Sequence, residues 1–309
     1  MANEHVGARQ EIAFAVETER GTKVDPTTSE WYPHTGQGFV PVVEFVTDNS
    51  GMGRIEGVLT EDIAKEYSQG TVSMRLYDSF LTPLNRMIFG AVGSGTPVAY
   101  TVENSNVHNS FTIATADPVE GDNTYAKGML NTCTITCNTD DYINLSMEFI
   151  AEKETAATLT PSYSTSATLF TPDNVTFGYA TNYAGLAAPT TMTVKNFQLN
   201  VEKNVVLNWS LGDTEPSEIE NGRMSITGDI TLKYNSTTYR DFALADTPKA
   251  VIIDMNNGVF SWEIKLPSAI FKGWNRSTDL DGIVEETFGF TANYDDETNG
   301  LVQATVTTL

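Results

Sequence analysis

The sequence predicts a mainly β chain, built as two tandem antiparallel β domains of sandwich or barrel type, each with a short flanking helix. Three observations support this. Apolar and polar residues alternate with period two over many short segments, helical periodicity is confined to two or three short stretches, and one β unit occurs twice. Chains in which strands dominate and helices are few and short form antiparallel sheets.

The duplicated unit occupies residues 37–80 and 191–234, which match without a gap at a spacing of 154 positions. Strand faces, an acidic segment and a helix start all match. Two Thr-rich strands can align by chance, but such an alignment would not bring the acidic segments and helix starts into register as well. A self-match at a fixed spacing is typical of an architecture made of repeated units.

The repeat favours two domains, and the boundary falls where periodicity is lost. Residues 152–172 are rich in Thr, Ser, Ala and Pro without alternation. We therefore expect a first domain at 1–158 and a second at 159–309. Residues 91–128, which are polar and rich in Gly and Asn, are expected to form an insertion, as a long loop or an extra hairpin.

The expected strands follow the alternating segments. They are 11–17, 43–45 with a return from 55, 71–78, 129–137, 143–149, 197–201 with a return at 205–211, 224–234, 284–294 and 302–306. Trp209 and Trp262 stand in line with apolar neighbours and are expected in the core. Cys133 and Cys137 share one strand face about 13 Å apart at ~3.3 Å per residue, too far to pair with each other. We expect two buried thiols.

Two short helices are expected where the period changes. Thr82 suits an N-cap, Pro83 the first helical position and Gly90 the end. In the second copy Ser236 suits the N-cap. Helices this short are unstable alone, so both must pack on a sheet.

The formal net charge is −22. A chain this acidic, without a Lys/Arg cluster, is not expected to bind nucleic acid through its phosphates. The charge serves solubility, or a surface that repels a passing polyanion. No run of about 18 apolar residues exists, so no membrane span is expected, and the first nine residues carry no apolar leader core, so secretion is not expected.

The sequence holds no recognisable catalytic or metal-binding pattern. It lacks a phosphate-binding glycine loop, a G-x-S-x-G elbow, an H-E-x-x-H pair and an EF-hand. His5, His34 and His108 stand in loops without a partner motif. Among 40 acidic residues some carboxylate pair arises by chance, so a glycosidase pair has no support. We expect no enzyme, no cofactor and no metal site.

Two acidic segments, 60–66 and 212–222, each connect long strands at the same position of the repeat. A plain hairpin needs only about 2–5 residues, so these connections are longer than pairing requires. Each is either a solvated connection or a contact that reaches another subunit. The candidate contact residues are Glu61, Asp62, Glu66, Asp213, Glu215, Glu218 and Glu220.

Several stretches resemble tail tube proteins of tailed bacteriophages. They are Phe14-Ala15-Val16-Glu17-Thr18-Glu19-Arg20-Gly21-Thr22, the block from Val194 to Leu232, Glu286-Thr287-Phe288-Gly289-Phe290-Thr291-Ala292-Asn293-Tyr294-Asp295, and the final Val306-Thr307-Thr308-Leu309. The resemblance covers most of the chain and is strongest from about 160 to 309. The 91–128 insertion departs from a minimal tube domain.

The resemblance implies a sandwich-like domain with a flanking helix, whose long strands join neighbours in a ring. Stacked rings would line a tube with a continuous β-barrel. A chain with two such domains closes the ring with three copies and pseudo-sixfold symmetry; six copies is the alternative. The implied partners are further copies, tape-measure, tail terminator, and baseplate or tail-tip proteins, with no membrane. The implied location is the virion tail, after assembly in the host cytoplasm.

Under this resemblance the acidic segments become contacts between rings, and two polar strand faces become candidates for the lumen. Those faces carry Asn196, Gln198, Asn200, Ser225, Thr227 and Asp229. A negative bore would let phage DNA pass without specific binding.

The competing function class is a β-sandwich binding module, such as a phage adhesin, a capsid decoration protein or a carbohydrate-binding protein. Modules of this class expose aromatic residues on a groove. The expected core positions of Trp209 and Trp262 disfavour it.

Overall fold

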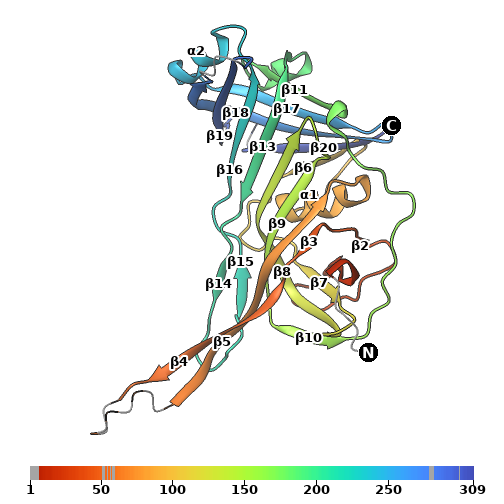
Figure 1. The fold of residues 1–309 in the computed structure, drawn as a ribbon, viewed down its shortest axis with the longest axis vertical. Helices are drawn as coiled ribbons and strands as arrows, with labels where there is room; N and C mark the ends of the chain where they lie inside the picture. Colours follow the sequence, from red (N-terminus) through yellow and green to blue (C-terminus); the bar gives the residue numbers. More distant parts are fainter. Residues whose placement is uncertain are drawn as a thin grey trace.

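The computed structural model describes residues 7–50, 53, 55, 57, 60–277, 282–298 and 300–309. Eighteen strands join in one antiparallel sheet network, and two more form a separate ribbon. The α-helices of the described chain are α1 (Leu81–Phe89) and α2 (Thr238–Ala245). The predicted mainly β, antiparallel fold is therefore confirmed. The molecule is elongated, with the C-terminal strands at one end and the β4–β5 hairpin projecting at the other (Figure 1).

The strands divide into two sets along the chain. The N-terminal half contains β1 (Glu11–Val16), β2 (Trp31–Tyr32), β3 (Gly36–Gln37), β4 (Val40–Asp48), β5 (Thr60–Arg75), β6 (Val98–Thr101), β7 (Phe111–Ala116), β8 (Asp122–Asn138), β9 (Asn144–Ala151) and β10 (Glu154–Ala157).

The C-terminal half contains β11 (Val175–Ala180), β12 (Thr190–Met192), β13 (Val194–Glu202), β14 (Val206–Asn208), β15 (Glu218–Glu220), β16 (Ser225–Lys233), β17 (Lys249–Asn256), β18 (Phe260–Arg276), β19 (Glu285–Asn293) and β20 (Gln303–Thr308). Four 3-10 helices complete the described elements: η1 (Gly7–Arg9), η2 (Asp78–Phe80), η3 (Pro172–Asn174) and η4 (Tyr183–Ala187).

One order of strand pairing occurs in both halves. In the N-terminal half the order is β4–β5–β9–β8–β7–β1–β2, with β10 on the second edge of β8. In the C-terminal half it is β13–β16–β19–β18–β17–β11–β12, with β20 on β18. A helix follows β5 and β16 alike. A division into domains at residue 158 stays a prediction.

The pairing gives a register for comparing the halves. Gly70 lies between Phe39 and Phe149, and Gly228 lies between Leu199 and Phe290. Gly228 is therefore the counterpart of Gly70. The two glycines are 158 positions apart, and Phe39 and Leu199, which lie opposite them, are 160 positions apart. The predicted ungapped spacing of 154, which places Gly70 on Met224, is therefore wrong.

The two halves are joined by strand pairing. The second part of β8 pairs with β13 over seven residues, from Thr132 opposite Glu202 to Asn138 opposite Asn196. Side chains cross the junction, since Thr134 Oγ1 donates to Asn200 Oδ1 at 3.0 Å. One core cluster extends through both halves, because Ile135 and Leu199, which face each other in this pairing, both belong to it. We call this pairing the internal junction.

The 91–128 range holds β6, β7 and the start of β8 rather than a long loop. β7 and β8 form a hairpin, and β7 has a counterpart in β17. β6 pairs with β20 of the C-terminal half, from Val98 opposite Val306 to Thr101 opposite Gln303. The segment before β7 thus ties the halves together a second time.

Helix α1 is buried between the halves. Its Leu81, Leu84, Met87, Ile88 and Phe89 are all buried, and Asn85 Oδ1 accepts from Trp262 Nε1 of β18 at 3.2 Å. In α2 no residue is buried, although Tyr239 and Phe242 pack on the sheet. Leu244 of α2 is 76% exposed. Two helices at the same position of the repeat thus differ in what covers them.

The predicted helix starts were wrong by one or two residues. The N-caps are Phe80 and Thr237, and neither makes a side-chain capping bond. Thr82 lies inside α1, whereas Ser236, one residue before the N-cap of α2, accepts from the Thr238 N–H through Oγ at 3.4 Å. The 3-10 helix η2 leads directly into α1, so the Leu81 N–H donates to the Asp78 carbonyl in place of a side-chain cap. The predicted stop is confirmed, because Gly90 has φ 74° and its N–H donates to the Arg86 carbonyl at 2.9 Å.

The predicted hairpin of 197–201 with 205–211 does not form. β13 pairs with β8 and β16 on its two edges, so the following chain turns away and pairs as β14 with β15. Trp209 is therefore only half-buried and Leu211 is 106% exposed, which corrects the expected core position of Trp209. Trp262 is fully buried as expected.

The other expected strands are present, and both thiols are buried and free. A return strand is predicted to begin at Ile55 and Leu59. Leu59 lies outside the described residues, and the observed return strand, β5, begins at Thr60. Neither α-helix of the described chain is long and apolar enough to span a membrane.

Candidate functional site

Two arms connect matching strands of the repeat. The first arm comprises the described residues of 43–66, at the far ends of β4 and β5. The second arm comprises residues 206–220, with β14 and β15 as its two strands. Figure 1 shows the first arm projecting from the body while the second runs alongside the base of β5 and β8.

The first arm exposes apolar side chains on both of its faces. Phe45 and Ile63 lie opposite each other and are 58% and 46% exposed, and Val46 is 58% exposed. No strand pairs with the outer edge of β4 in the described part of the chain. A projecting hairpin with exposed apolar side chains and an open edge is a contact surface or an aggregation hazard.

The acidic residues of the first arm lie in a strand, which corrects the expected connection at 60–66. Glu61 and Asp62 pair with Thr47 and Val46 within the β4–β5 hairpin. The apolar alternation that marks a strand is missing here because neither face of the arm is covered by the chain itself. Both carboxylates are exposed.

Glu66, at the base of the first arm, connects the two arms. Its N–H donates to the Thr214 carbonyl at 2.7 Å, and its carboxylate accepts from Thr214 Oγ1 at 3.0 Å. Lys153 Nζ lies 3.7 Å from Glu66 and 2.6 Å from Glu215. Tyr67 packs edge-on against Trp209, with ring centroids 6.0 Å apart. The base of one arm thus holds the other.

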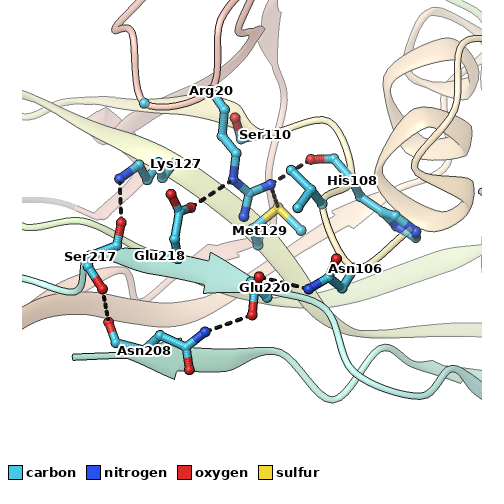
Figure 2. Close-up of polar contacts among 12 residues, drawn as sticks. Arg20, Asn106, His108, Ser110, Lys127, Met129, Asn208, Ser217, Glu218 and Glu220 are labelled. Atoms are coloured by element: carbon cyan, nitrogen blue, oxygen red, sulfur yellow. Dashed lines mark hydrogen bonds and ion pairs between the residues drawn. The ribbon is translucent and has the colours of Figure 1, made fainter. Parts of the chain in front are cut away.

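Two further acidic residues of the second arm, Glu218 and Glu220, bind to the N-terminal half (Figure 2). Glu218 lies 3.5 Å from Arg20 Nε. Glu220 accepts from Asn106 Nδ2 and from Asn208 Nδ2, both at 2.7 Å. Asp213 stands in an exposed turn. Three of the four predicted contact carboxylates of this arm, Glu215, Glu218 and Glu220, are therefore already engaged within the chain.

Arg20 and Glu17 organise the surface on which the second arm lies. Arg20 donates to the His108 carbonyl at 2.7 Å, beside Met129 (Figure 2). The buried Glu17 carboxylate accepts hydrogen bonds from Gly21 N at 2.8 Å, Ser110 Oγ at 2.5 Å, Thr112 Oγ1 at 3.1 Å and Lys127 N at 2.9 Å. These bonds compensate the cost of burying the charge.

Lys203, which follows the predicted strand at 197–201, is buried at the internal junction. It is 2% exposed, and its Nζ donates to the Met87 carbonyl near the end of α1 at 2.6 Å. Burial lowers the pKa of Lys203 to about 7, with a smaller effect from the charge of Arg20. Burial likewise lowers the pKa of His108 to about 4, helped by the charge of Lys203. A lysine after an apolar strand offers no sequence signal for this position.

The six predicted lumen residues share one face of the β13–β16 pair. Gln198 lies opposite Asp229, Asn200 opposite Thr227, and Ser225 opposite Glu202, while Asn196 lies next along the same face. Across the internal junction the face continues through Thr132, Thr134 and Thr136 of β8. The structure thus gathers these side chains on a broad polar sheet face. Neutral hydroxyls and amides dominate it.

The comparisons with known proteins agree with this architecture. The sequence model of a family described as phage tail tube protein matches residues 7–307. The chain belongs to the phage tail tube protein family. This family is structural rather than enzymatic, and membership makes the protein a component of the virion tail. The search of curated proteins found no match.

The described residues of this tail tube family member contain no cluster of metal-ligating side chains. No three or more His, Cys, Asp or Glu side chains gather closely enough in the described chain to hold an ion. Three surface features bear on the role of the protein: the projecting first arm, the open strand edges and the polar sheet face.

The buried lysine of this tail tube protein gives a pH prediction. The unfolded state binds a proton at Lys203 up to a pKa of about 10.5, while the folded state releases it near pH 7. Between these values the unfolded state binds more protons, so the free-energy cost of releasing the Lys203 proton on folding falls as pH rises. Relative to Lys203→Met, wild-type unfolding free energy should rise by up to about 1.4 kcal/mol per pH unit.

Urea unfolding at pH 7, 8 and 9 checks this, with Lys23→Met as an exposed control whose curve should run parallel to the wild type. If Lys203→Met also runs parallel, Lys203 is not deprotonated in the folded protein.

Proposed function

We propose that this protein is the major subunit of a tail tube, whose copies close into rings that stack into a hollow conduit for phage DNA. The internal junction carries the proposal. Two units with one pairing order are already joined side by side by strand pairing within a single chain. Three chains would supply six such units and close the ring with pseudo-sixfold symmetry; six chains is the alternative.

Assembly through strand edges has a physical basis. An open strand edge carries unpaired N–H and C=O groups, and closure into a barrel is the arrangement that removes edges altogether. Contacts that use different surfaces on the two partners form rings when their rotation closes. Among the described residues, no strand pairs with the outer edge of β4 or with the edge of the last part of β18 that faces away from β19.

The polar sheet face is the proposed wall of the bore. Its Thr, Asn, Gln and Ser side chains suit a water-filled lumen, and no basic cluster is present to hold phosphates. Asp229 adds negative charge, and the chain as a whole carries −22. Lys233 and Lys272 lie toward one side of the same face, and Lys233 stands opposite Glu285. In this proposal DNA passes because the wall offers it few and separated cationic contacts.

The first arm is the proposed contact between stacked rings, with Glu61 and Asp62 at its exposed part. The second arm does not serve this role in the same way, because its carboxylates are engaged on the N-terminal half. Tape-measure, terminator and baseplate or tail-tip proteins are the further partners proposed for a tube subunit, with assembly in the host cytoplasm. The binding-module alternative finds no support in Trp262, which is buried, or in Trp209, which packs on Tyr67.

Electron microscopy of the concentrated protein tests the proposal directly. We expect rings or hollow tubes in negative stain, and the mass per ring distinguishes three chains from six. A protein that stays monomeric at every concentration, with and without preformed tail tips as initiators, would contradict the tube function.

The apolar pair of the first arm gives a second prediction. Phe45→Ser with Ile63→Ser should leave the unfolding midpoint nearly unchanged, since both side chains are largely exposed, but should prevent rings from stacking. Val119→Ser, at a position 62% exposed in the turn after β7, is the matched control and should still give tubes. Tubes of normal length from the double variant would show that the arm does not connect rings.

A third prediction concerns the charge on the polar sheet face. Tubes carrying Gln198→Lys and Asp229→Lys should retain double-stranded DNA in co-sedimentation at low salt and release it as salt rises. Wild-type tubes should retain little. Glu120→Lys, in the exposed turn before β8, serves as a charge control. Equal DNA retention by wild type and the lysine variant would remove this face from the lumen.

A further inference from the structure

Two unpaired strand edges in this chain correspond to the two strands of the internal junction. The junction joins β8 of the N-terminal half to β13 of the C-terminal half. In the repeat, β18 is the counterpart of β8, and β3 with the start of β4 is the counterpart of β13. From Ile270 to Arg276, β18 pairs only with β19, and β4 pairs only with β5, among the described residues.

We propose that β18 of one copy pairs antiparallel with the start of β4 of the next copy, with Arg276 opposite Phe39, Asn275 opposite Val40 and Trp274 opposite Pro41. The inference rests on the proposed ring function and assigns its inter-chain interface residue by residue. The occupant of each open edge is a second copy of this chain.

The register follows from counterparts on the two sides of the junction. Phe39 lies opposite Gly70, which pairs with Phe149 of β9. Leu199 lies opposite Gly228, which pairs with Phe290 of β19. Phe39 therefore corresponds to Leu199. Leu130 corresponds to Phe271, because they pair with Phe149 and Phe290.

Ile135 stands five positions after Leu130, and Arg276 five after Phe271, with one bulge in each interval. Leu199 lies opposite Ile135 in the junction. The same relation between copies therefore sets Phe39 opposite Arg276.

The hydrogen-bonding directions of both open edges agree with this register. Alternate residues of an antiparallel strand direct N–H and C=O to opposite edges. Gly38 N donates to the Thr71 carbonyl at 2.9 Å, so Phe39 directs its N–H and C=O, and Pro41 its C=O, away from β5.

On the other strand, Ser277 N donates to the Glu285 carbonyl at 2.8 Å, so Trp274 and Arg276 direct their groups to the open edge of β18. The junction has the same phase, since Lys203 N donates to the Asn131 carbonyl at 2.8 Å. In a register slipped by one residue, the residues that direct N–H and C=O to the open edge of one strand would lie opposite residues that direct theirs away from it. The ladder hydrogen bonds could then not form.

Helix α2 is a second, independent observation in favour of this partner. Its counterpart α1 is covered by both halves of the chain, whereas α2 has no buried residue. If the C-terminal half of one copy meets the N-terminal half of the next as the halves meet within the chain, α2 acquires the cover that α1 already has. The exposed Leu244 then packs at an interface.

Cysteine pairs test the register. Val40 is 53% exposed and Asn275 is exposed, and they form a non-hydrogen-bonded pair in the proposed register, with Cα atoms about 4.5 Å apart, within reach of a disulfide. The native thiols do not interfere, because burial raises the pKa of Cys133 to about 12 and of Cys137 to about 11.

Under mild oxidation, Val40→Cys/Asn275→Cys should form covalently closed multimers on a non-reducing denaturing gel. Neither single variant should cross-link alone, while a mixture of the two should give dimers, because the two surfaces differ. Asn200→Cys/Thr134→Cys, the matching pair of the internal junction, should close within one chain. Val40→Cys/Ser277→Cys, slipped by two residues on the same face, is the matched control and should cross-link far less.

The outcomes separate this inference from the ring function. Stronger cross-linking of the slipped pair, or self-linking of Val40→Cys alone, overturns the register even if microscopy shows rings. Rings without any cross-link from Val40→Cys/Asn275→Cys overturn it while leaving the ring function standing. Absence of both rings and cross-links overturns both.

Discussion

The pairing of β8 with β13 is the interaction on which the rest of the structure depends. It fixes two similar β units side by side and makes their apolar faces parts of one core. Three further contacts stabilise the same relation: β6 on β20, α1 against Trp262, and Lys203 on the Met87 carbonyl. Backbone bonds set the register, and burial of α1 makes separation of the halves costly.

The internal junction also explains why the two arms differ. Both leave the sheet between matching strands, but the second arm finds the surface of the N-terminal half beside it. Arg20, Lys127 and Lys153 supply the positive groups that its acidic residues and carbonyls require. The first arm has no such surface within its own chain, so its apolar side chains stay exposed. One topology thus yields one packed arm and one projecting arm.

The sequence predicts those strands whose one face is buried by the chain, because burial imposes period-two alternation. β13, β16 and β19 are examples, as is the polar face that gathers Asn200 and Thr227. Prediction failed where the partner was distant. Residues 205–211 alternate like a return strand, yet β13 already has both edges occupied by β8 and β16. The strand at 60–63 shows no alternation because the described chain covers neither of its faces.

Residue roles at the site were harder to predict than strands. Glu215, Glu218 and Glu220 were identified by charge and position, but their partners come from residues 20, 106 and 153, and no local pattern indicates such pairs. Lys203 and Glu17 are buried ionisable groups with partners far along the chain: the Met87 carbonyl for Lys203, and Ser110, Thr112 and Lys127 for Glu17. A carboxylate or an ammonium at the end of an apolar strand looks the same in sequence whether it is solvated or enclosed.

The open edges combine complementarity with protection against indiscriminate pairing. Pro41 directs its missing N–H toward the open edge of β4, so one ladder bond is absent there in any partner, and Gly273 interrupts β18 with φ 65°. Each edge is therefore a poor template for a generic strand. A partner whose own irregularity falls beside the proline loses least. In the proposed register, β18 of another copy would bring the bulge near Gly273 next to Trp274, which would lie opposite Pro41. The proline and the bulge weaken pairing of these edges with other strands. Their free-energy cost is therefore smallest when the two edges pair with each other.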